Sequence, residues 1–232
     1  MEMKHNKQLI SLRSSNQGFT MVELLVAMVV SLLAMAAIYS TFLAQHRSYQ
    51  VQEETAEMQQ NIRAAMYYMQ REIRMAGNDP HNAGGFGITA ANANSITFTE
   101  DITGPAAGVD SVPRPDGFVN FPNENITYQL NGTDLVRIDN NDVPPVPQMV
   151  AQNISWLDFA YLDDTGAETA VLGDIRSVEI TIVARTDNQL LFGTTNNNVY
   201  WNQQGTRSFG PPGDNFSRRR LTALIHCRSL GL

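Results

Sequence analysis

The hydrophobic pattern divides the chain into an amino-terminal part, with a basic segment and an apolar run, and a long polar remainder. Residues 1–17 are polar and carry mostly basic charges: Glu2, Lys4, Lys7 and Arg13. Residues 24–45 follow with 22 positions and no charged side chain. Because about 20 mostly apolar residues cross a bilayer, this run predicts one membrane-spanning helix. The excess of Lys and Arg on its amino side predicts that the amino end faces the cytoplasm.

The helical pattern continues beyond the span as an amphipathic stripe. Apolar and small residues recur at spacings of three and four, as a helix with one buried face requires: Val51, Thr55, Met58, Ile62, Ala65, Met69 and Ala76. Gly77-Asn78-Asp79-Pro80 is typical of a helix end, with glycine just past the last turn and proline beyond it. We therefore expect one helix over residues 19–77, transmembrane over 19–44 and an amphipathic stalk over 45–77.

Residues 78–232 predict a mainly β globular head made of antiparallel strands. Residues 81–94 favour a loop, and Pro, Gly and Asn predict long loops over 104–123 and 186–215. Asn131-Gly132 is a strong hairpin signal. Alternation of apolar and polar residues predicts six strands: Ser95–Glu100, Asn125–Leu130 with Thr133–Ile138, Val150–Leu162, Ile175–Arg185 and Leu221–Cys227. The strand over residues 175–185 is expected to be half-buried. The fold class is therefore α+β, a long amino-terminal helix packed on an antiparallel sheet.

Composition narrows the choice of partners. The net charge of −7 gives no reason to expect nucleic acid as a partner. Cys227 is the single cysteine, so no disulfide forms within the chain. Between Arg13 and Arg47 the one charged side chain is Glu23, at the threshold of the apolar run.

Two ordinary interpretations of the amino end stand beside a more specific one. The chain could carry a secretory signal peptide cleaved after Ala34-Met35-Ala36, which would release a secreted ligand-binding β domain. It could also be a plain membrane anchor, in which Thr20 and Glu23 form a capping box that starts the helix. Under that second interpretation the leader stays attached.

The stretch Gly18-Phe19-Thr20-Met21-Val22-Glu23, between a basic leader and an apolar helix, resembles the class III signal of type IV pilins and pseudopilins. The resemblance implies that residues 1–18 are a leader removed by the prepilin peptidase, and that the new amino terminus at Phe19 is methylated. It also implies that Glu23 registers an incoming subunit in the fibre. A carboxylate in a membrane helix is costly, and such residues usually pair and mark function. An α-amino group four residues earlier lies on the same helical face.

The head resembles that of PilW-like minor pilins, on the evidence of residues 174–185 (DIRSVEITIVAR) and 218–230 (RRRLTALIHCRSL). This resemblance implies a structural subunit, not an enzyme, that primes or tips a type IV pilus. Its expected partners are the prepilin peptidase, the major pilin, other minor pilins and the inner membrane. The expected location is the inner membrane with the head in the periplasm, and then the pilus fibre. The alternative is a minor pseudopilin of type II secretion.

No pattern predicts a catalytic residue, a cofactor, a metal or a small-molecule substrate. The acidic stretches at 139–142 and 163–168 do not match the calcium loop of an EF-hand, and turn chemistry explains both. His226 and Cys227 are adjacent, so on a strand they point to opposite faces. The basic run Arg218-Arg219-Arg220 suits either an interface with acidic neighbours or a solvated strand edge.

Overall fold

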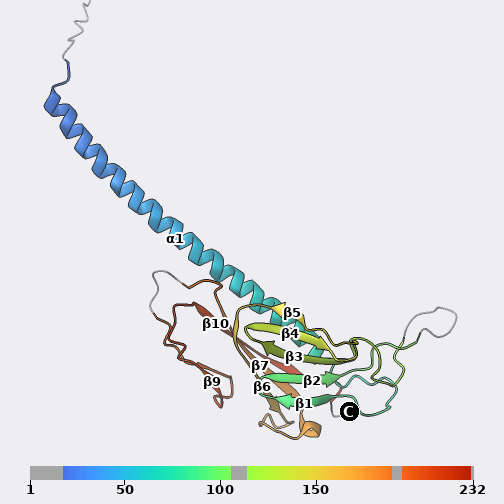
Figure 1. Cartoon of the computed structure of the whole chain (residues 1–232). Coiled ribbons are helices and arrows are strands. Elements are labelled where there is room, and N and C mark those ends of the chain that lie inside the picture. The colour runs from blue at the N-terminus through green and yellow to red at the C-terminus, as the bar shows by residue number, and fades with distance from the viewer. Residues whose placement is uncertain (1–17, 106–113, 190–194, 231–232) are drawn as a thin grey trace, which may run out of the picture. The chain divides into compact units, whose positions relative to one another are not determined.

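The computed structural model describes residues 18–105, 114–189 and 195–230 (Figure 1). The leader predicted over residues 1–18 therefore lies outside the described residues, except for Gly18. The chain divides into two compact units, Met1–Tyr49 and Gln50–Leu232, and the boundary falls within the long helix α1, Met21–Ile73. The two units are described separately below.

The part of α1 in the first unit is a solvent-facing apolar helix. From Met21 to Tyr49 every side chain is exposed except the half-buried Leu43. Ser31, Ser40 and Thr41 donate their hydroxyl hydrogens to main-chain carbonyls of Ala27 and Ala37 on the preceding turn. These bonds satisfy the aliphatic hydroxyls of the apolar run within the helix, which suits a helix surrounded by lipid.

The second unit contains the carboxyl-terminal part of α1 and ten strands. A single buried core joins the helix to two antiparallel sheets. Five strands form the first sheet in sequence order (Figure 1): β1 (Ile88–Asn92), β2 (Ser95–Thr99), β3 (Asn125–Asn131), β4 (Asp134–Asp139) and β5 (Gln148–Ala151). The second sheet has the order β10-β7-β6: β6 (Ile154–Leu162), β7 (Ser177–Arg185) and β10 (Arg218–His226). A short 3-10 helix η1 (Leu172–Asp174) and a two-stranded ribbon complete the unit: β8 (Tyr200–Trp201) and β9 (Ser208–Phe209).

The amphipathic stripe of α1 packs into this core as expected from Met58 onward. Five of its members are less than a tenth exposed: Met58, Ile62, Ala65, Met69 and Ala76. Val51 is exposed, so the buried face begins about two turns later than the pattern predicted. Ile73, four residues after Met69 on the same face, is also fully buried, and the chain tightens just beyond it. The main-chain N–H of Ala76 donates to the carbonyl of Ile73, three residues back.

Gly77 marks the end of the helical segment as predicted, although the regular helix α1 already ends at Ile73 and not at residue 77. Gly77 has a φ of +81°, a conformation that residues with a Cβ rarely adopt. Its main-chain N–H donates to the carbonyl of Thr99, so the chain leaves the helix directly onto β2. A Cβ added at Gly77 would lie 2.6 Å from Cδ2 of Leu230, so the carboxyl-terminal tail packs over this turn.

Four predictions need correction, the first because residues 186–215 are not all loop and contain β8 and β9. Residues 81–94 are not all loop, because Ile88–Asn92 forms β1 and pairs with β2. Val150–Leu162 is not one strand, because Gln152 and Asn153 turn between β5 and β6, and Asn153 has a φ of +58°. The last strand begins at Arg218, so the basic run belongs to it. The β3–β4 hairpin at Asn131-Gly132 is confirmed.

Strand β7 is covered on both faces and not on one. Its outward-facing Glu179 and Thr181 are as buried as Ile180. The segment around β8 and β9 covers that outer face: the main-chain N–H of Gln203 donates to Glu179 Oε1 over 2.9 Å, and Gln204 Nε2 donates to Oε2 over 3.0 Å. Apolar and polar residues alternate along β7 as the sequence predicted, but the polar face is buried because a polar segment covers it.

Candidate functional site

The residues from Gly18 to Glu23 lie on exposed chain in front of the apolar helix. Gly18, Phe19 and Thr20 precede α1, and the Phe19 side chain is 89% exposed. A Cβ placed at Gly18 would have no atom within 4 Å. The peptide bond between Gly18 and Phe19 therefore lies on exposed chain outside the helix.

The structure brings Thr20 and Glu23 together in a reciprocal capping box. The Thr20 hydroxyl accepts from the main-chain N–H of Glu23 over 3.2 Å. Glu23 Oε2 accepts from the main-chain N–H of Thr20 over 3.0 Å and from its hydroxyl over 2.9 Å. This geometry satisfies amides that the first helical turn leaves without partners. Glu23 thus has local partners while the leader is attached.

By length and composition, α1 can cross a membrane, and the apolar window that meets this test lies near the amino terminus with none of it buried. The predicted signal-peptidase motif at Ala34–Ala36 lies inside this continuous helix. A wholly exposed apolar helical surface is stable only when lipid or other protein covers it.

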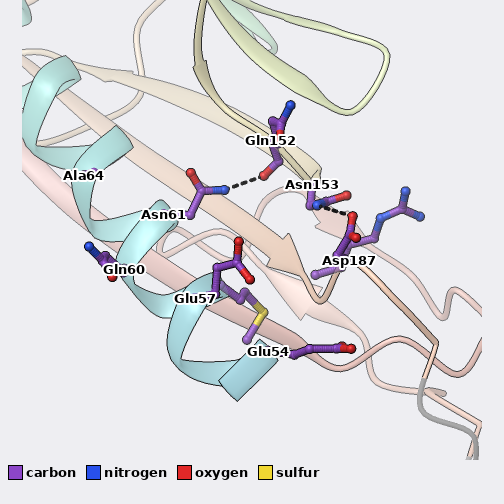
Figure 2. Close-up of a pocket in the computed structure, with 10 residues that line it drawn as sticks. Glu54, Glu57, Gln60, Asn61, Ala64, Gln152, Asn153 and Asp187 are labelled. Atoms are coloured by element: carbon purple, nitrogen blue, oxygen red, sulfur yellow. Dashed lines mark hydrogen bonds between the residues drawn. The ribbon is translucent and has the colours of Figure 1, made fainter. Parts of the chain in front are cut away.

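The second unit contains a polar cleft of about 510 Å³ between α1 and the ends of the β5–β6 turn and β7 (Figure 2). Its lining is mostly carboxylates and amides: Glu54, Glu57, Gln60, Asn61, Gln152, Asn153 and Asp187. Asn61 Nδ2 donates to the main-chain carbonyl of Gln152 over 2.7 Å, and this bond ties the helix to the turn (Figure 2). Asn153 Nδ2 donates to Asp187 Oδ1 over 3.0 Å. The bond between Asn61 and Gln152 therefore joins α1 to the β-sheet part of the unit at this cleft.

Two polar atoms in the lining of this cleft have no hydrogen-bond partner among the described residues. They are Glu54 Oε2 and Arg185 Nε, and both are buried. The Arg185 guanidinium lies 4.4 Å from the ring centroid of Phe216, a cation–π arrangement. The described lining of the cleft contains carboxylates, amides and Arg185, and no His, Cys or Ser.

Buried carboxylates organise the loops at one end of the first sheet, and sequence patterns gave no sign of this. Glu124 is fully buried and accepts four main-chain N–H groups, from residues 102, 103, 120 and 121. Asp101, also fully buried, accepts those of Asp116 and Gly117. Each carboxylate acts as an internal anion in a nest of amides. The partners lie up to 22 residues away in sequence, so only the tertiary fold shows the arrangement.

Glu100 lies beside this group with an unusual protonation equilibrium. Burial raises the pKa of Glu100 to about 7, with a further contribution from the negative charge of Glu72 that Arg137 partly offsets. Glu72 itself accepts from Arg137 Nε over 2.9 Å and from the Tyr128 hydroxyl over 2.6 Å, and these bonds fix α1 to β3 and β4. Burial, followed by the charge of Glu72, raises the pKa of Tyr128 and keeps it a donor.

The acidic stretches show turn chemistry. Asp163 Oδ1 accepts from the Thr165 hydroxyl and from the main-chain N–H of Ala167, and the Thr165 bond is the main cause of the lowered pKa of Asp163. The Asp139 carboxylate likewise accepts from the main-chain N–H groups of Asn123 and Asn141. Among residues 18–105, 114–189 and 195–230, no group of three or more His, Cys, Asp or Glu is placed to hold a metal ion.

The adjacent residues His226 and Cys227 lie in different environments, one exposed and one buried. His226 is exposed and its Nδ1 shares a hydrogen bond with the Ser177 hydroxyl over 2.7 Å. Cys227 is buried, and burial raises its pKa to about 12, so the thiol stays neutral and unreactive at ordinary pH.

Residues 13–39 match the family model for the prokaryotic N-terminal methylation motif. This match confirms the class III signal expected at residues 18–23. The structure is similar to that of a type IV-like pilin, TTHA1219 from Thermus thermophilus, with a TM-score of 0.49 and 12% sequence identity. The alignment covers 75% of this chain and 97% of that one. No curated protein sequence matches the chain. The motif and the apolar helix together fit a membrane-anchored precursor of the pilin type.

Proposed function

We propose that the chain is a minor pilin, a structural subunit that helps to prime or tip a type IV pilus. The observation that carries the proposal is the methylation motif over residues 13–39, which runs directly into a helix with no buried side chain up to residue 49. The precursor sits in the inner membrane with its head in the periplasm. The prepilin peptidase cuts between Gly18 and Phe19 and methylates the new terminus, and the helix stays with the mature chain.

Assembly is driven by burial of the exposed apolar helix against the helices of the major pilin and other minor pilins. Apolar surface that leaves lipid contributes to association through packing contacts, and surface that would otherwise face water contributes through the hydrophobic effect as well. Cleavage creates an α-amino group at Phe19, four residues before Glu23 on the same helical face. The amine supplies a counter-charge to a carboxylate whose one hydrogen-bond partner among the described residues is Thr20.

The role requires no catalysis from this chain. The head carries loops held by internal carboxylates and a polar outer layer, features that set which neighbours it contacts. A head of this kind on a single helix suits a subunit present in few copies. Assignment to the PilW-like branch rests on the resemblance of residues 174–185 and 218–230.

The decisive test of the assembly role compares Glu23→Ala with Glu53→Ala, which removes an exposed carboxylate beyond the predicted span. We expect both variants to lose the leader at the same rate, as read by the mass of the membrane-bound protein. We expect only Glu23→Ala to be missing from fibres sheared off the cells. Normal incorporation of Glu23→Ala would refute the pairing role.

Deletion of the chain distinguishes the pilus from the type II secretion apparatus. Loss of surface fibres and twitching with intact protein export supports the minor pilin. Loss of export with intact fibres identifies a minor pseudopilin instead.

A further inference from the structure

Three of the four outer edges of the two sheets are protected against pairing with another strand. Strand β5 has four residues and follows three prolines, Pro144, Pro145 and Pro147. Strand β1 has a register shift between Ile88 and Ala90. On the free side of β6, the main-chain N–H of Phe159 donates to the carbonyl of Ala93 over 2.7 Å. Short strands, prolines, bulges and covering loops are the usual protections of an edge.

The fourth edge, β10, has none of these features. It pairs with β7 over nine consecutive residues without a register shift and contains no proline or glycine. In the part of the chain that the structure describes, β7 is its one neighbour in the sheet. A long regular edge of this kind is a template for an additional strand.

The hydrogen-bond pattern shows which amides face the open side. The main-chain N–H of Thr186 donates to the carbonyl of Ser217, and that of Cys227 donates to the carbonyl of Arg176. Odd-numbered residues of β10 therefore bond to β7, because bonding alternates along an antiparallel strand. The N–H and C=O groups of Arg220, Thr222 and Leu224 point away from β7. No hydrogen bond from the described residues reaches these groups.

The open edge carries a definite charge pattern. Arg218 is internally neutralised by Asp214, and its side chain is almost fully buried. Arg219 and Arg220 are exposed, and Arg220 Nη1 donates to the main-chain carbonyl of Trp201, nineteen positions earlier. Leu224, four residues along the same face as Arg220, is 44% exposed. The edge thus has a basic end and an apolar end in a chain of net charge −7.

We propose that the β10 edge binds an extended acidic segment of another protein by β-strand addition. The main-chain groups of Arg220, Thr222 and Leu224 supply the ladder bonds. Acidic side chains of the added strand lie opposite Arg219 and Arg220, and an apolar side chain lies opposite Leu224. A second copy of β10 is the wrong occupant, because residues 218–226 contain no Asp or Glu and offer no counter-charge in any register.

The test uses the full chain in detergent micelles and a labelled synthetic peptide of ten residues. The acidic probe alternates Glu with Val and Thr, and the control probe has Lys in place of each Glu. Fluorescence anisotropy measures binding, and hydrogen exchange measures protection of the β10 amides. Thr222→Pro removes an outward N–H that β7 does not use, a substitution edge strands tolerate. Thr222→Ala keeps that N–H and is the matched control.

We expect the acidic probe to bind, the Lys probe not to bind, and bound peptide to protect the amides of residues 220, 222 and 224. Thr222→Pro should weaken binding about tenfold, since it deletes a ladder donor, while Thr222→Ala should not. Exchanging both Arg219 and Arg220 for Glu should make the chain prefer the Lys probe. Equal binding of both probes, amides already protected in the free chain, or a β10-mediated dimer would each overturn the proposal.

Discussion

Glu100 provides the sharpest link between one side chain and the stability of the head. Its carboxyl is nearly buried, lies near the negatively charged Glu72 and Glu124, and has a pKa raised from 4.5 to about 7. The folded chain therefore holds this proton more tightly than the unfolded chain does. Between pH 4.5 and 7 the unfolded chain releases the proton first, so a rise in pH favours unfolding through this group.

The magnitude follows from the two pKa values. Each unit of difference corresponds to 1.36 kcal/mol, so a shift from 4.5 to about 7 destabilises the fold by up to about 3 kcal/mol at pH 8. Glu100→Gln keeps the shape of the side chain and removes the charge. We expect this variant to match the parent chain at pH 4.5 and to exceed it in free energy of unfolding by about 2–3 kcal/mol at pH 8.

The assay is urea unfolding of the full chain in detergent, followed by the fluorescence of Trp156 and Trp201, at several pH values from 4.5 to 8. Glu53→Gln is the matched control, because it removes one exposed carboxylate of the same unit. A stability difference between Glu100→Gln and the parent that is the same at every pH would refute the reasoning. So would a loss of stability confined to pH 8.

Three further substitutions test other parts of the account. Gly77→Ala should destabilise the head by about 1–3 kcal/mol in the same urea assay, because φ is +81° and the new Cβ meets Leu230; unchanged stability would contradict the tail packing. Glu124→Gln should cost about 2 kcal/mol and speed hydrogen exchange at residues 102, 103, 120 and 121, whose amides it accepts; exchange unaltered there would contradict it. Arg207→Ala should cost about 2–4 kcal/mol, because it leaves the buried Asp158 without the guanidinium 2.6 Å away; a neutral effect would show that Asp158 needs no counter-charge.

Local chemistry allowed prediction of the features that neighbouring residues determine. The helix stop at Gly77 and the hairpin at Asn131-Gly132 depend on a few adjacent residues, and the sequence pattern located both. The capping box of Thr20 and Glu23 is of the same kind. The methylation motif was recognisable because its spacing is fixed within six residues.

Features that depend on distant partners were not predictable. Strand β1 is a short run after a glycine-rich segment, and only its pairing with β2 makes it a strand. The outer face of β7 looked solvent-exposed because Glu179 and Thr181 are polar, whereas residues 203 and 204 cover it. Glu124 resembled any surface acid in sequence, since the amides it accepts belong to loops that fold back from 3 to 22 positions away.

The central claim is tested most directly by the amino terminus of the mature protein. Sequencing and mass measurement of the chain purified from membranes should show Phe19 as the first residue, with one added methyl group on its amine. A chain that begins at Ala37 would contradict the account, since the apolar helix would then be a discarded signal. A chain that keeps its leader would contradict it as well, leaving Thr20 and Glu23 as a capping box and nothing more.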